Sequence, residues 1–95
     1  MTAYVIMDIV VHDPDRYEEY KLLAPPAIAA YGGKYLVRGG PAENVEGKWQ
    51  PNRMVVLEFE STDKAKAFIN SPEYADARAL RQSVATSEGI VVEGL

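Results

Sequence analysis

The feature that most constrains the fold is an apolar run near the start of the chain. Residues 4–11 read Tyr-Val-Ile-Met-Asp-Ile-Val-Val, and residues 54–59 repeat this almost continuously apolar pattern. A strand with one face in water alternates apolar and polar residues, whereas a strand covered on both faces does not. Both segments therefore predict strands in a sheet whose two faces are each covered.

Helix signals follow the first of these strands. Asp13 suits an N-cap and Pro14 the first helical position, while Gly32-Gly33 offers a left-handed stop. Pro25-Pro26 removes two amide donors, which predicts a kink or a restart at Pro26. One face of this helix is marked by residues spaced three and four apart: Tyr17, Tyr20, Ala24, Ala27, Ile28 and Tyr31.

The rest of the chain alternates strand and helix signals. Residues 34–38 predict a second strand, and residues 39–52, which contain the only tryptophan, predict a long hairpin connection to the strand at 54–59. Ser61 and Ser71 are caps for two further helices, the second of which is expected to end at Gly89. Residues 90–93 then predict a fourth strand.

This order of elements predicts an α+β fold of the ferredoxin-like βαββαβ type. Its four-stranded antiparallel sheet carries the helices on one face, and the first and third strands are expected to be central and parallel. The uncovered face would expose an apolar patch, so we expect two copies to pack sheet against sheet as a homodimer. Residues 1–95 are accordingly interpreted as one domain, half of a dimeric α/β barrel.

Composition excludes several classes of protein and site. With no cysteine, the chain has neither disulfides nor a thiolate metal site, and a cytoplasmic location is expected. A net charge of −4 disfavours binding to nucleic acid, and no apolar run reaches membrane-spanning length. A single histidine, His12, makes no metal site, so no metal or cofactor is expected.

Short motifs in a fixed order along the chain carry a resemblance to a known family. They are Asp13-Pro14 with Tyr17 and Tyr20, Tyr31-Gly32-Gly33, Arg38-Gly39-Gly40, Glu46-Gly47, Glu58-Phe59 with Ser61, and Ser71-Pro72-Glu73-Tyr74. Together they resemble the domain-of-unknown-function 1330 family and imply the dimeric α/β-barrel superfamily. That superfamily includes cofactor-independent monooxygenases, isomerases and ligand-sensing domains, so the resemblance implies no particular reaction. Phe68-Ile69 stands where the family often has aromatic residues, and a pocket there would have a different lining.

Two carboxylates interrupt the apolar strands. If the side chains of Asp8 and Glu58 point to one face of adjacent strands, one pKa would rise and yield a usable acid or base. Arg38, on the strand beside Glu58, would otherwise neutralise the pair. The alternative is that all three residues form a structural ion network at a barrel end or a dimer seam.

Other polar residues are candidates for binding. Tyr17 and Tyr20 could present hydroxyls to a small molecule between helix and sheet, although aromatic residues on such a stripe usually belong to the core. Arg78 and Arg81, with Glu46, could bind a carboxylate-bearing ligand, meet across the dimer, or lie on a solvated helix face.

The leading hypothesis is a homodimeric domain that handles a small apolar or aromatic compound. In a cofactor-independent enzyme of the monooxygenase or isomerase type, Arg38 would orient an anionic group, Glu58 would move a proton and Tyr20 would donate a hydrogen bond. Asp8, Tyr17, Glu46, Arg78 and Arg81 are the candidate binding residues. The alternative is a non-catalytic ligand-binding or oligomerisation module in which these residues only stabilise the dimer.

Overall fold

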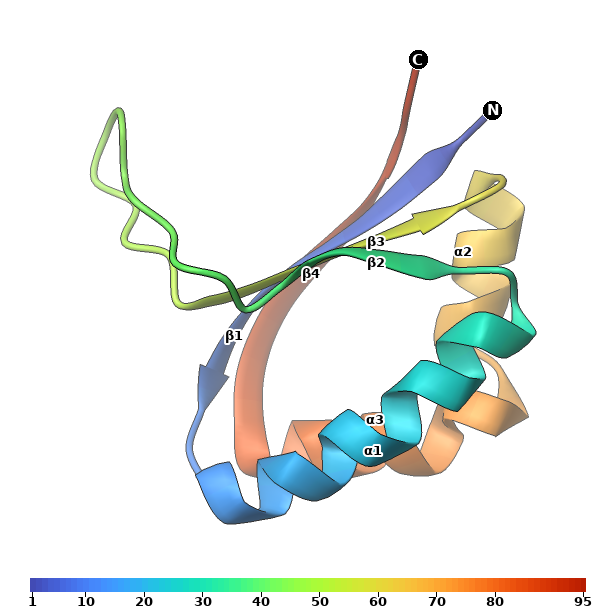
Figure 1. Cartoon of the computed structure of the whole chain (residues 1–95), viewed down its shortest axis with the longest axis horizontal. Coiled ribbons are helices and arrows are strands. Elements are labelled where there is room, and N and C mark those ends of the chain that lie inside the picture. The colour runs from blue at the N-terminus through green and yellow to red at the C-terminus, as the bar shows by residue number, and fades with distance from the viewer.

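Four strands and three helices alternate along the chain in the computed structural model, which describes residues 1–95 (Figure 1). The elements are β1 (Ala3–Val11), α1 (Pro14–Ala30), β2 (Lys34–Arg38), β3 (Arg53–Phe59), α2 (Thr62–Ile69), α3 (Pro72–Val84) and β4 (Ala85–Glu93). None of the three helices is both long and apolar enough to cross a membrane.

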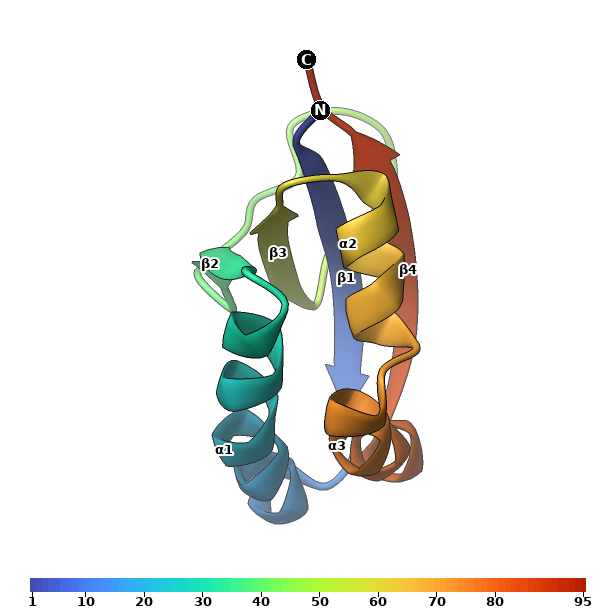
Figure 2. The same ribbon diagram turned by 90° about the vertical axis from the view of Figure 1, so that its right-hand side faces the viewer.

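The strands form one antiparallel sheet in the order β2-β3-β1-β4. All three helices lie on the same face of this sheet (Figure 2). The predicted ferredoxin-like βαββαβ fold is therefore confirmed, with β1 and β3 at the centre. The prediction that β1 and β3 are parallel is wrong: the crossover through α1 brings β2 back parallel to β1, and the connection from β2 to β3 reverses the chain.

The predicted caps are confirmed at all three helices. The side chains of Asp13, Ser61 and Ser71 each accept a hydrogen bond from a backbone amide of the first turn. Each bond satisfies one of the amide donors that a helix leaves unpaired at its start. The positions of the helix starts are thus determined by local sequence.

Helix α1 does not restart at its two prolines, although a restart was one of the two outcomes predicted there. It runs without a restart from Pro14 to Ala30, with Pro25 and Pro26 inside it. Pro25 has no N–H to donate to the carbonyl of Lys21, four residues earlier. The guanidinium of Arg38 donates to that carbonyl instead, over 3.1 Å, and so joins the edge strand β2 to the helix.

The last helix also ends earlier than predicted. Helix α3 stops at Val84 and β4 begins at Ala85, so Gly89 lies inside the strand rather than at the helix end. Gly89 is opposite Met7 of β1, and a Cβ atom on Gly89 would collide with the sulfur of Met7. The glycine therefore makes room for a side chain of the neighbouring strand.

The hydrophobic core fills the layer between sheet and helices. Alternate residues of the central strands point into it, among them Val5 and Ile9 of β1, and Leu57 and Phe59 of β3. The ring of Phe68 from α2 stacks on Phe59 and lies 4.3 Å from the ring of Tyr74, centroid to centroid. This layer joins the sheet to the helices.

The opposite face of the sheet carries no helix. Val37, Val56, Ile6 and Ile90 lie side by side in one row across all four strands on this open face. Ile90 is 58% exposed and Val37 is 39% exposed. The second apolar face predicted from the strand pattern is therefore present and uncovered in a single chain.

Candidate functional site

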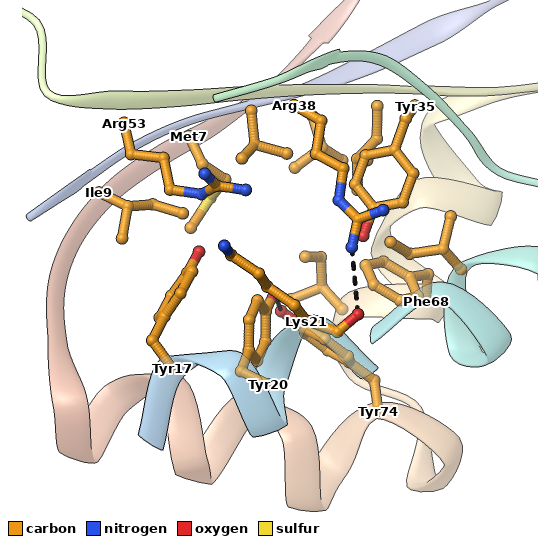
Figure 3. A pocket seen from close by; sticks show the side chains of 15 residues that line it. Met7, Ile9, Tyr17, Tyr20, Lys21, Tyr35, Arg38, Arg53, Phe68 and Tyr74 are labelled. Atoms are coloured by element: carbon orange, nitrogen blue, oxygen red, sulfur yellow. Dashed lines mark hydrogen bonds between the residues drawn. The ribbon is translucent and has the colours of Figure 1, made fainter. Parts of the chain in front are cut away.

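A narrow pocket lies between α1 and the covered face of the sheet (Figure 3). Its polar lining consists of tyrosines and cations, and we call it the tyrosine-arginine pocket. These polar residues are Tyr17, Tyr20, Lys21, Tyr35, Arg38, Arg53 and Tyr74. Its apolar floor includes Met7, Ile9 and Phe68, which project from the sheet and from α2.

The deepest polar groups are two phenols. The hydroxyls of Tyr20 and Tyr74 are 2.6 Å apart and share a hydrogen bond in which either can donate. Arg81, whose side chain is almost fully buried, donates from Nε to the Tyr74 hydroxyl over 3.4 Å. Burial raises the pKa of Tyr20 far above its ordinary value, and the adjacent Tyr74 adds to this effect. Tyr20 therefore stays protonated and acts as a hydrogen-bond donor.

Two arginines hold positions over tyrosine rings. The guanidinium of Arg38 lies 4.6 Å from the centre of the Tyr35 ring, and that of Arg53 lies 5.5 Å from the centre of the Tyr17 ring. These are cation–π distances. Arg53 passes across Gly39, where a Cβ atom would collide with its guanidinium. Because Gly39 has no side chain, the side chain of Arg53 can extend past it.

The arginines of the pocket have no acidic partner. The structure contains two ion pairs, Lys21 with Glu18 and Lys34 with Glu58, and neither involves an arginine. No aspartate, glutamate or histidine lines the pocket, and Arg53 Nε is buried without a hydrogen-bond partner. An unpaired buried donor is costly. This arrangement favours a ligand that brings negative charge.

The empty space in the pocket is small, about 30 Å³. A cavity needs roughly 10–15 Å³ to hold one water, so this space has room for about two or three. The cationic ends of Lys21, Arg38 and Arg53 converge on it (Figure 3). Arg38 is exposed, whereas Lys21 and Arg53 are partly exposed, so a ligand larger than water would have to displace these flexible side chains.

The sequence hypothesis placed Glu58 in one site with Arg38 and Tyr20, but the structure separates Glu58 from them. The alternation of the strand directs Glu58 to the open face, opposite Tyr4, where it pairs with Lys34 at 3.8 Å. Arg38 is opposite Val55, on the covered face. The proposed partnership of these two residues is therefore wrong, since the sheet lies between them.

Asp8 and Glu58 do share the open face, but they do not form a pair. Asp8 is opposite Met54, four positions along β3 from Glu58, which places them roughly 13 Å apart along the strand. The carboxylate of Asp8 accepts from the indole N–H of Trp49 and from the amide of Asn52, both over 2.9 Å. The bond from Trp49 is the main reason that the pKa of Asp8 is lowered. Asp8 therefore remains ionised and fastens the 39–52 connection.

The other candidates have mixed positions. Tyr17 is only 3% exposed and belongs to the core as well as to the pocket, while His12 is exposed and contacts the Thr86 hydroxyl. Glu46 lies in the exposed 39–52 connection, which extends away from the three helices (Figure 1). The structure therefore does not place Glu46 beside Arg78 and Arg81. Arg81 is only 6% exposed, so the interpretation as a solvated helix face is wrong for this residue.

Sequence reasoning missed four of the seven polar pocket residues, Lys21, Tyr35, Arg53 and Tyr74. Arg53 shares the parity of the buried Val55 and Leu57, and this alternation was a usable signal. Tyr35 and Arg38 lie on one face because the pairing register shifts between Tyr35 and Val37. No pattern in the sequence predicts that register shift.

The donor set of the pocket suits an anion rather than a metal ion. Guanidinium groups and neutral phenols donate hydrogen bonds, whereas metal ions require carboxylate, imidazole or thiolate ligands. Across the structure, no three histidine, aspartate or glutamate side chains gather into a potential metal site.

Several solved structures share this fold. A protein of unknown function from Rhodopseudomonas palustris is 20% identical, with a TM-score of 0.78 over 99% of this chain and 82% of that one. A dimeric ferredoxin-like protein of unknown function from Jannaschia sp. CCS1 is 13% identical, with a TM-score of 0.73 over 99% of this chain and 100% of that one. SnoaB, a cofactor-independent oxygenase from Streptomyces nogalater, is 13% identical, with a TM-score of 0.69 over 99% of this chain and 93% of that one.

A sequence comparison with curated proteins finds no match. The model of one protein family, however, matches residues 2–95, almost the entire chain. The matched residues include the Ser71-Pro72-Glu73-Tyr74 segment that caps α3 and supplies Tyr74 to the pocket. The chain belongs to the family described as Domain of unknown function (DUF1330).

Proposed function

We propose that this protein binds the anionic form of a small aromatic compound in the tyrosine-arginine pocket, and that it does so as a homodimer. The observation that carries the proposal is the set of arginines around an aromatic pocket with no acidic partner. Arginine is the side chain best suited to hold a planar anion through several hydrogen bonds. Tyr17, Tyr20 and Tyr35 supply flat apolar surface for a ring.

The pocket would favour the ionised form of a weakly acidic ligand. A positive charge within about 4–6 Å lowers the pKa of an acidic group by about 1–3. An enol or phenol bound between Arg38 and Arg53 would therefore lose its proton more readily than in water. The protonated Tyr20 hydroxyl would donate a hydrogen bond to the resulting oxyanion.

Homodimerisation is supported by the open face of the sheet. Its row of apolar residues, Val37, Val56, Ile6 and Ile90, is continuous across four strands. Contiguous apolar surface of this kind marks an interface. The Jannaschia protein with the same fold is described as dimeric. Two chains meeting through this face would form a dimeric α/β barrel with a tyrosine-arginine pocket on each outer side.

A second candidate function is oxygenation without a cofactor, favoured by the similarity to SnoaB over nearly the whole chain. In that reaction an ionised aromatic methylene compound gives electrons directly to O2. The CH2 group becomes C=O in a four-electron oxidation, one oxygen atom enters the product, and the other leaves as water with the two hydrogens. Isomerisation has less support, because the pocket offers no carboxylate or imidazole to move a proton.

Titration with 4-nitrophenol tests the binding proposal, because only its phenolate absorbs strongly in the visible region. We expect the protein to lower the apparent pKa of 4-nitrophenol by about 1–3. Arg53→Gln should abolish most of this change, while Arg16→Gln, at an exposed position of α1, should preserve it. Equal binding of uncharged nitrobenzene would overturn the proposal.

An oxygen electrode separates the two candidate functions. Oxygen uptake in the presence of 1-naphthol, whose keto tautomer carries a CH2 group at C4, would support the oxygenase if it depended on Arg53 and were absent with heat-denatured protein. Binding of the phenol without any oxygen uptake would support a non-catalytic ligand-binding module.

A further inference from the structure

A second and larger cleft lies on the helical side of the sheet, between α3 and β4. Its volume is about 280 Å³. One wall is made by Arg78, Arg81 and Gln82 of α3, and the other by residues of β1 and β4. It is well above the roughly 10–15 Å³ that one water needs, so it has room for a small organic molecule.

Small residues in β4 create this space. The pairing register directs Ala85, Ser87, Gly89 and Val91 to the covered face, opposite alternate residues of β1. The side chain of Met7 occupies the space directly over Gly89, and Ser87 is short. A gap therefore remains between α3 and β4, with Met7 in its wall.

The helical wall of the cleft is cationic and incompletely paired. Arg81 is 6% exposed and has no acidic partner. The Nη1 atom of Arg78 donates to the carbonyl of Ile69 over 3.3 Å, whereas its Nε is buried with no partner. The hydroxyl oxygen of Ser87 is likewise buried with no partner. Buried donors without acceptors are costly, and here they border an open space.

The remaining walls of the cleft are apolar. They are formed by Val5 and Met7 of β1, Ile69 of α2 and Val91 of β4. No aspartate or glutamate lines the cleft. A ligand that satisfies both kinds of wall has a carboxylate at one end and a hydrocarbon body at the other.

We propose that the cleft between α3 and β4 is a second binding site, which takes a small amphipathic carboxylate. Arg78, Arg81 and Ser87 hold the carboxylate, and Met7, Ile69 and Val91 contact the hydrocarbon part. Arg81 also donates to Tyr74 of the tyrosine-arginine pocket, so one side chain borders both sites. Met7 and Ile69 line both spaces, but the groups that hold the carboxylate, Arg78, Arg81 and Ser87, do not line the first pocket, so this site does not depend on the function proposed there.

An NMR titration with hexanoate tests this inference, using amide resonances to locate the bound molecule. We expect hexanoate to shift amides of residues 78–91 and to bind at least tenfold more tightly than hexanamide, its uncharged analogue. Arg78→Met should weaken hexanoate at least tenfold. Arg16→Met removes a charge from the exposed surface of α1 and is the matched control that should leave hexanoate binding intact.

A blocking variant makes the test independent of core stability. Gln82 is exposed at the cleft, so Gln82→Trp should fold normally and exclude hexanoate by filling the opening. Equal affinity for hexanoate and hexanamide would overturn the proposal, as would equal affinities of Arg78→Met and Arg16→Met. If sulfate bound as tightly as hexanoate, the proposed preference for a ligand with a hydrocarbon part would be wrong. Shifts confined to residues 17–38 would assign hexanoate to the first pocket and reject the second site.

Discussion

The two faces of the sheet carry different sets of charged side chains. Arg38 and Arg53 point to the face covered by helices, whereas Asp8 and Glu58 point to the open face. Arg53 and Glu58 belong to the same strand, and the alternation of that strand directs them to opposite faces. Strand parity and one register shift thus place these two arginines and these two acids on different faces.

The difference extends to how well the charges are satisfied. On the open face, Asp8 holds Trp49 and Asn52, and Glu58 pairs with Lys34. On the covered face, Arg53 has a buried nitrogen with no partner and no arginine has an acidic partner. We infer that Asp8 and Glu58 stabilise the fold, and that Arg38 and Arg53 are available to bind a ligand.

The largest expected effect concerns packing on the covered face. Phe68→Ala removes a ring that contacts Phe59 and Tyr74, and should lower the free energy of unfolding by about 3–5 kcal/mol. Val37→Ala on the open face should cost about 1 kcal/mol or less at a protein concentration that favours the monomer. Urea denaturation measures both. Equal losses would show that the two faces do not differ in packing.

The next effect concerns association through the open face. Ile90→Lys would bury a charge from each chain in the proposed dimer, and should weaken dimerisation by at least about a hundredfold. Leu22→Lys, at an exposed apolar position of α1 on the helical side, is the control and should leave the dimer intact. Sedimentation equilibrium decides between these outcomes. A monomeric Leu22→Lys and a dimeric Ile90→Lys would place the interface on the helices.

A smaller effect is expected where the covered face meets α1. Arg38→Met removes the hydrogen bond to the carbonyl of Lys21 and should destabilise the protein by about 1 kcal/mol. Arg16→Met should have almost no effect on the midpoint of thermal unfolding. If the two variants unfold at the same temperature, the contact between β2 and α1 contributes nothing to stability.

The smallest effect is the response of the open face to acid. Because the pKa of Asp8 is lower in the folded protein than its ordinary value of 3.8, Asp8 stabilises the fold above that value. This contribution is lost as the pH falls through the folded pKa. Trp49 is the only tryptophan, so its fluorescence should change below pH 3.8 and this change should vanish in Asp8→Asn. A midpoint above 3.8 would contradict the assignment.

Much of the fold followed from local patterns. The caps at Asp13, Ser61 and Ser71 and the apolar strands predicted every element, because these signals act within a few residues. The end of α3 was misplaced, since Gly89 was interpreted as a stop signal. Its actual role, making room for Met7, depends on a neighbouring strand that local sequence does not reveal.

The site was less predictable for the same physical reason. Arg38 and Tyr20 were identified as candidates, and they do line one pocket. Glu58 was assigned to that pocket although its parity differs from that of Val55 and Leu57, which directs it to the other face. The shift between Tyr35 and Val37 is a tertiary feature, so the position of Arg38 relative to its neighbours required the structure.

Pro25 determines which group Arg38 contacts when no ligand is present. Because Pro25 leaves the Lys21 carbonyl free, Arg38 has a weak acceptor to occupy when no ligand is present. An anion bound as proposed would compete with a backbone carbonyl of α1 for the same guanidinium. A residue with an N–H at position 25 would bond to that carbonyl from within the helix and release Arg38. The proline would thus lower the affinity of the pocket for an anion.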